Sequence, residues 1–113
     1  MKIQTRTEED VTILDLDGKL TIGLGDVQLR DAVREALNDG AKKLLLNLKG
    51  VRTMDSSGLG ELIRCKATAA NRGATIKLLH VEDKVEEVLE MTRLIGVFDN
   101  FDDEIDAVAS FRD

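Results

Sequence analysis

The feature that most constrains the fold is an unbroken apolar run, LLLNL at residues 44–48, which leads into the stretch TMDSSGLGEL at 53–62. The run is too short for a helix, and its lack of alternation is typical of a strand that is covered on both faces. We therefore expect residues 44–48 to form the central strand of a sheet with helices against it.

Weaker patterns on both sides of this run define the other elements. A first strand is expected at residues 2–7, and a second strand, VTILDL, ends at 17–18. The short turn EED joins them, which predicts an antiparallel hairpin. Apolar spacing predicts helices over 29–37 and from DSSG to about 72, with a strand at 75–79. A third helix with a capping box of Asp83 and Glu86 would end at Gly96, and a strand at 97–98 would precede a last helix capped by Asp102 or Asp103.

This order of elements predicts one α/β domain over residues 1–113. The initial hairpin makes the sheet mixed, because its first two strands are antiparallel and the later strands, which alternate with helices, are mostly parallel. About four helices would be packed against the sheet. The alternation of strand-like and helix-like spacing of apolar residues along the chain thus predicts the fold class.

Composition limits the classes of function. The chain has a net charge of -6, no Trp or Tyr and only three Phe, which argues against nucleic acid as a partner. It lacks both the ~20 apolar residues of a membrane span and the apolar core of a signal peptide, so we expect a cytoplasmic protein without a membrane segment. Residues 41–80 carry eight basic and two acidic side chains, so a surface there could attract an acidic protein or a phosphate, unless the other segments neutralise it.

Enzymatic chemistry lacks its usual motifs. Ser56, His80 and Asp55 supply the residue types of a serine hydrolase, but Met54 stands where the G-x-S-x-G turn needs its first glycine. The two G-x-G tripeptides lack a third glycine, and one Cys and one His are too few for a zinc site. We expect no cofactor and no metal, and a serine hydrolase remains the enzymatic alternative.

The stretch DSSG marks the start of the second helix, although Gly58 and Gly60 each cost about 1 kcal/mol relative to alanine inside a helix. Asp55, Ser56 and Ser57 could each cap this helix, and the sequence leaves open which one does. The two glycines suggest access for another protein to the serine hydroxyl. A phosphate on that hydroxyl would be stabilised by the free amides and the helix dipole.

The second helix has two faces. The spacing predicts an apolar face of Leu59, Leu62, Ile63, Ala67 and Ala70. The opposite stripe consists of Ser57, Glu61, Arg64, Thr68 and Arg72.

The segment LLLNLKGVRTMDSSGLGELI resembles the signature of STAS domains, the family of sulfate transporters and anti-sigma-factor antagonists, in which an apolar strand leads into D-S-[ST]-G-[LI]-x-x-[LI]. The resemblance extends more loosely over nearly the whole chain. It implies a bacterial partner-switching protein and not an enzyme. The unphosphorylated form of such a protein would bind an anti-sigma factor that is also a serine kinase. The kinase would phosphorylate Ser56, a metal-dependent serine phosphatase would reset the switch, and Ser57 would be the neighbouring position that is not the main acceptor.

One departure from the family concerns the loop after the second strand. Many members have an aspartate there, whereas this chain has Thr21 followed by IGLGD, and Asp26 could substitute only if the loop shifted. We expect the binding surface to comprise the 21–26 loop, the DSSG turn and the stripe residues Glu61, Arg64, Thr68 and Arg72, because sites in α/β proteins tend to follow the strands. The alternative within this fold is a STAS regulatory module of another signalling complex.

Overall fold

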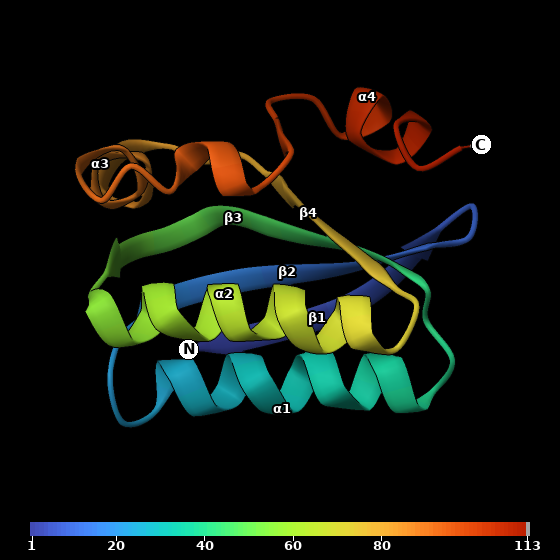
Figure 1. Cartoon of the computed structure of the whole chain (residues 1–113), viewed down its shortest axis with the longest axis horizontal. Coiled ribbons are helices and arrows are strands. Elements are labelled where there is room, and N and C mark those ends of the chain that lie inside the picture. The colour runs from blue at the N-terminus through green and yellow to red at the C-terminus, as the bar shows by residue number, and fades with distance from the viewer. Residues whose placement is uncertain (113) are drawn as a thin grey trace.

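The computed structural model describes residues 1–112 and shows a five-stranded sheet with helices on both sides (Figure 1). The strands lie in the order β1-β2-β3-β4-β5, with β1 antiparallel to β2 and the other neighbours parallel. They are β1 (Lys2–Glu8), β2 (Val11–Leu20), β3 (Lys43–Met54), β4 (Thr75–Leu79) and β5 (Asn100–Phe101). The helices are α1 (Gly25–Asn38), α2 (Ser56–Asn71), α3 (Asp83–Met91) and α4 (Glu104–Ala109), with a 3-10 turn η1 (Ile95–Val97). The predicted α/β fold is confirmed.

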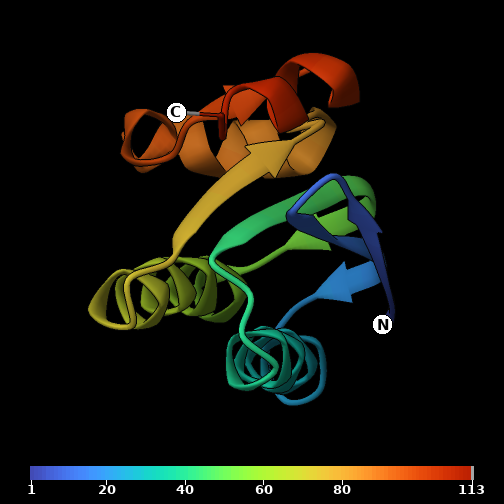
Figure 2. The same ribbon diagram turned by 90° about the vertical axis from the view of Figure 1, so that its right-hand side faces the viewer.

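The central position of β3 explains its unbroken apolar run. Leu44 and Leu46 belong to the larger core, together with residues of α1 and α2 such as Leu29 and Leu62. Leu45 belongs to a second core on the other side of the sheet, which α4 completes. Figure 2 shows α1 and α2 side by side on one side of the sheet and the C-terminal elements on the other. Both faces of β3 are therefore covered, as its sequence predicts.

The strands β2 and β3 run further than predicted, and this brings their ends together. Leu20 and Met54, the last residues of the two strands, are partners in the parallel register. The chain segments that follow β2 and β3 consequently emerge side by side at one end of the sheet, on the left of Figure 1. The antiparallel pairing of β1 begins only at Lys2 opposite Asp17, so the final residues of β2 have no β1 neighbour.

Glycines follow the ends of α1 and α2, whereas the end of α3 corrects a prediction. Gly40 and Gly73 follow α1 and α2 with φ values of 98° and 74°, the left-handed conformation expected of a C-terminal glycine. The third helix ends earlier than predicted, at Met91, and Arg93 takes the left-handed position with φ of 61°. The N–H of Leu94 then bonds to the carbonyl of Leu89 at 2.8 Å, which closes the helix. Gly96 lies in η1 and caps nothing.

The C-terminal third contains two further corrections. The capping box of Asp83 and Glu86 is wrong, because Asp83 is itself the first helical residue and Glu82, at the N-cap, makes no side-chain hydrogen bond. The short last strand is Asn100–Phe101 and not 97–98, since β5 pairs with the end of β4. Asp103 caps α4 as one of the two predicted candidates, accepting the N–H of Ile105 at 2.8 Å. Among residues 1–112, no helix has the length and apolar content to cross a membrane.

The buried face of α2 is rotated from the predicted one. Ala67 and Ala70 are exposed, whereas Cys65 and Ala69 are buried together with Leu59 and Leu62. The reason is that α2 packs against α1 as well as against the sheet, so its covered surface extends toward α1. Periodicity gives the apolar content of a helix face but does not reveal a second neighbouring helix.

Candidate functional site

Asp55 organises the end of the sheet where β2 and β3 stop. Its Oδ1 accepts the N–H of Gly58 at 2.9 Å, which makes Asp55 the N-cap of α2. Its Oδ2 accepts the N–H of Ile22 at 3.0 Å, in the loop between β2 and α1. The N–H of Ile22, and then that of Gly58, hold the pKa of the Asp55 carboxyl below its usual range. One ionised side chain thus caps a helix and fastens the adjacent loop.

Gly58 serves close packing, which corrects the prediction that it provides access for a partner. A Cβ at this position would lie 2.0 Å from the carbonyl oxygen of Leu20, so no side chain fits. Gly25 makes a similar approach at the start of α1, where a Cβ would lie 2.2 Å from the carbonyl oxygen of Lys19. Two helices therefore begin directly against the end of β2. Gly60 differs, because a Cβ there would meet only the Arg64 guanidinium, at 3.7 Å.

Ser56 is the first residue of α2 and is exposed, whereas Ser57 is half-buried. Since Asp55 provides the cap, the Ser56 hydroxyl is not needed to begin the helix. Within residues 1–112, neither serine hydroxyl makes a side-chain hydrogen bond, so neither contacts His80. The Nδ1 of His80 lies instead 3.6 Å from Oε2 of Glu82. The nucleophile and base of a hydrolase are not brought together here.

The loop beside Ser56 carries two exposed apolar side chains that the sequence analysis missed. Ile22 is 72% exposed and Leu24 is 62% exposed. The signal was present in TIGLGD, where two large apolar residues stand in a glycine-rich stretch that belongs to no helical or strand pattern. Thr21 is half-buried, and its carbonyl accepts the N–H of Asp26, a residue of the first turn of α1. Exposed apolar groups of this kind are typical of a protein-binding surface.

Glu61 is buried, which is the main correction to the predicted polar stripe. It is only 2% exposed, and its Oε1 lies 3.5 Å from Nε of Arg30 on α1 and 3.5 Å from Nη2 of Arg64. Burial and the adjacent Glu61 carboxylate raise the pKa of the Cys65 thiol to about 12. Glu61 therefore lies at the contact between α1 and α2, where a partner protein cannot reach it.

The rest of the stripe extends away from the loop. Thr68 is half-buried, and Arg72 follows the last residue of α2, about 24 Å along the helix axis from Ser56. There, Nη1 of Arg72 donates to Oδ1 of Asn38 at 2.9 Å. Arg64 is exposed and lies two turns from Ser56. The structure thus brings the 21–26 loop and the DSSG turn together, places Arg64 two turns further along α2, and leaves Thr68 and Arg72 toward the other end of the helix.

The mixed sheet, the paired strand ends and the serine at the head of α2 define a STAS-type domain. The family model described as Mlab, STAS domain matches residues 3–99, and the chain belongs to this family. The earlier resemblance to STAS domains is thereby confirmed.

Similar proteins include several named for sigma-factor regulation. The Anti-sigma F factor antagonist of Paenibacillus polymyxa is 26% identical over 117 residues, covering 99% of this chain and 96% of that protein. The crystal structure of a Thermotoga maritima protein, described as a candidate anti-sigma factor antagonist, has a TM-score of 0.88 at 27% identity and covers 98% of this chain and 95% of its own. The phosphorylated form of Bacillus SpoIIAA shares the fold, with a TM-score of 0.73 at 21% identity over 98% of this chain and 100% of its own.

Proposed function

We propose that this protein is an anti-sigma-factor antagonist, a switch that binds a kinase-type anti-sigma factor while Ser56 is unphosphorylated. The observation that carries the proposal is the exposed Ser56 hydroxyl at the head of α2, beside a loop that Asp55 holds in place. The names of the similar proteins support the same general role. The kinase would phosphorylate Ser56, and a serine phosphatase would remove the phosphate.

A phosphate on Ser56 is compatible with the folded state. The helix keeps its cap, because Asp55 and not Ser56 accepts the N–H of Gly58. The positive end of the α2 dipole also favours an anion at this position. The modification adds about -1.5 to -2 charge next to the ionised Asp55, so it changes the surface and not the fold.

The partner surface would combine the apolar side chains of Ile22 and Leu24 with Ser56 and the exposed Arg64. An unmodified Ser56 can be covered by another protein at little cost, because a hydroxyl is small and neutral. A phosphorylated Ser56 would bring its charge into an interface that excludes water, which is costly without a matching cation. Loss of the complex on phosphorylation follows from this difference.

Incubation with the cognate kinase and ATP, followed by mass spectrometry of peptides, tests the proposal. We expect one phosphate on Ser56, and loss of the complex with the kinase in size-exclusion chromatography. The control variant Ser57→Ala should be phosphorylated normally, and a fluorophosphonate probe, which labels hydrolase serines, should leave Ser56 unlabelled. Phosphate on Ser57 alone, or a phosphorylated protein that still binds, would contradict the assignment.

A further inference from the structure

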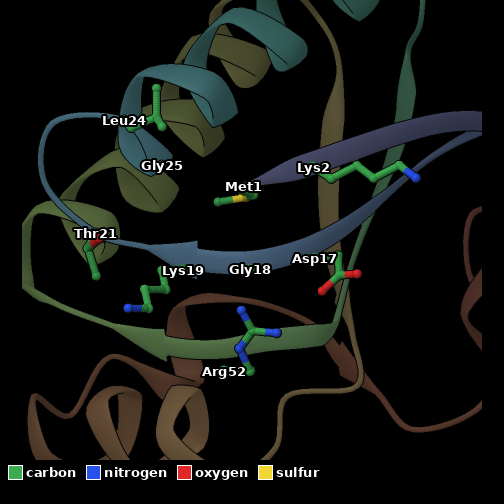
Figure 3. Close-up of a pocket in the computed structure, with 9 residues that line it drawn as sticks. All are labelled: Met1, Lys2, Asp17, Gly18, Lys19, Thr21, Leu24, Gly25 and Arg52. Carbon is green, nitrogen blue, oxygen red and sulfur yellow. The ribbon is translucent and has the colours of Figure 1, made fainter.

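The outer edge of β1 is open. β1 is the first strand in the order of the sheet, and within residues 1–112 it pairs only with β2. Figure 2 shows it in dark blue at the edge of the sheet, and Figure 3 shows its start, where Met1 lies on the α1 side of β2. The outward N–H and C=O groups of an edge strand can pair with another extended chain.

β1 also lacks the usual protection of an edge strand. Natural proteins block such edges with proline, bulges or charged side chains. The strand KIQTRTE contains no proline, and its pairing with β2 is regular throughout, without a bulge. The charged side chain in the middle of the strand, Arg6, is held by Asp15 and Glu104. The edge is therefore suited to strand addition, in which a segment of a partner extends the sheet.

A groove follows this edge between β1 and α1. It consists of two cavities of about 250 Å³ and 260 Å³ that share Ile3, Ala32 and Glu35. The small side chains of Ala32 and Ala36 leave room beside the strand, and Ile3 gives the groove an apolar floor. We call it the edge groove. A strand added to β1 would place the side chains of one of its faces over this groove.

The α1 wall of the edge groove is acidic. Asp31, Glu35 and Asp39, which we call the acidic ridge, line it at intervals of four residues, and no lysine or arginine side chain lines it. All three are exposed, and none has an ion pair or side-chain hydrogen bond within residues 1–112. The Oε1 of Gln28, at the same wall, is buried and has no hydrogen-bond partner. Negative charges and acceptors without partners favour a cationic ligand.

The spacing of the acidic ridge matches that of an extended chain. Residues four apart are separated by about 6 Å along a helix axis, and alternate residues of a strand by about 6.7 Å. β1 and α1 run in the same direction, because Met1 shares a cavity with Asp31, and Thr5 shares one with Asp39. Every second side chain of a strand added to β1 would therefore come opposite one carboxylate.

We propose that β1 and the edge groove bind an extended segment of a partner protein that has lysine or arginine at alternate positions. The backbone of the segment would pair with the open edge of β1, and its basic side chains would lie over the acidic ridge. A second copy of this chain is disfavoured, since two-fold pairing of β1 with β1 would bring two acidic ridges toward each other. The edge groove shares no residue with the surface proposed around Ser56, so this inference goes beyond the proposed function.

The test uses the whole protein and a synthetic peptide of alternating lysine and valine, blocked at both ends and long enough to span β1. Fluorescence anisotropy at low salt should show saturable binding, and hydrogen exchange should slow at alternate amides of β1. The same peptide with N-methylated central amides keeps its charge but cannot pair with a strand, so it should bind about tenfold more weakly. A peptide with glutamate in place of lysine should not bind.

Glu35→Gln, in the middle of the acidic ridge, should weaken binding of the lysine peptide about fivefold. The matched control is Glu90→Gln, which removes an exposed carboxylate on α3, outside the edge groove. It should change the affinity by less than about twofold. Equal losses in the two variants would overturn the proposal, since they would indicate diffuse attraction.

Three other results would also overturn it. The first is a lysine peptide that does not saturate, and the second is an N-methylated or glutamate peptide that binds as well as the lysine peptide. The third is a dimer of the protein alone that the lysine peptide dissociates, because a second copy would then occupy the edge. None of these measurements involves a kinase or phosphorylation of Ser56, so their outcome is separate from that of the proposed function.

Discussion

The backbone N–H of Ile22 donates a 3.0 Å hydrogen bond to Oδ2 of Asp55, and this contact joins two loops that are 33 residues apart in the chain. It links the segment after β2 to the segment after β3, at the point where the serine of the motif is exposed. The geometry of this end of the sheet therefore depends on one carboxylate with two partners. A substitution of Asp55 should therefore affect both segments.

Replacement of Asp55 by alanine should lower the free energy of unfolding by about 1–2 kcal/mol, because α2 loses its N-cap. The amide of Ile22 should also exchange faster with solvent, since its acceptor is gone. Asp55→Asn is the matched control and should lose less, because asparagine also caps helices. Urea unfolding and hydrogen exchange measure both effects, and an unchanged exchange rate at Ile22 would disprove the link.

Alanine at the two motif glycines should have opposite effects on stability. Gly58→Ala should destabilise the protein by about 2 kcal/mol or more, because the new Cβ would lie 2.0 Å from the carbonyl oxygen of Leu20. Gly60→Ala should stabilise it by up to about 1 kcal/mol, since only the exposed Arg64 side chain is near and alanine favours a helix. Urea denaturation of the two variants decides this, and equal losses would be inconsistent with the packing of Gly58.

Substitutions at Ser56 should separate stability from binding. Ser56→Ala and Ser56→Asp should both remain within about 0.5 kcal/mol of the wild type, because Asp55 caps α2 in each. Ser56→Ala should bind the kinase constitutively, whereas Ser56→Asp should bind poorly because its charge lies beside Asp55. Thermal melts and binding titrations with the kinase measure the two quantities. Wild-type affinity in Ser56→Asp would count against a charge-controlled switch.

Serine at the exposed apolar positions of the loop should weaken the complex without affecting the fold. Ile22→Ser and Leu24→Ser should each reduce affinity for the kinase about tenfold, while stability stays within about 0.5 kcal/mol. Met91→Ser is the matched control, because Met91 is 76% exposed at the end of α3, outside the proposed surface. Surface plasmon resonance gives the affinities, and an equal loss in Met91→Ser would remove the loop from the interface.

The ion-pair network of Arg6 should give part of the stability a pH dependence. Nε of Arg6 lies 2.7 Å from Oδ2 of Asp15, and its Nη1 lies 2.9 Å from Oε2 of Glu104. These contacts hold the pKa values of both carboxyls below their usual range. A carboxyl whose pKa is lowered by folding stabilises the protein fully at pH values above its pKa in the unfolded chain, about 4. This contribution is lost as the pH falls through the pKa of the folded state.

Arg6→Gln should therefore be less stable than the wild type by about 1 kcal/mol at pH 7, and this difference should shrink as the pH is lowered from 5 to 2. The matched control is Arg34→Gln on the exposed face of α1, for which the difference from wild type should not change over this range. Urea unfolding at several pH values provides the comparison. A stability difference between Arg6→Gln and the wild type that increased at low pH would contradict this prediction.

Much of the fold could be predicted from the sequence because its signals are local. The apolar run 44–48, the helical spacing of 29–37 and the strand at 75–79 each depend on neighbours in the chain, and all were placed correctly. The errors at Asp83 and Gly96 have a different origin. More than one residue near the ends of α3 could serve as a cap; in the structure Glu82 takes the N-cap position, and Arg93 takes the left-handed conformation after the helix.

The candidate site divides in the same way. The sequence alone determined that a serine would stand at the head of a helix after a buried strand, because strand and cap signals are adjacent in the chain. Only the tertiary structure decided that Gly58 packs on Leu20, that Ile22 is tied to Asp55 and that Glu61 is buried against α1. Each of these contacts joins residues about 30 or more positions apart. They depend on the register of β2 beside β3 and on the approach of α1 to α2, which periodicity within one segment does not encode.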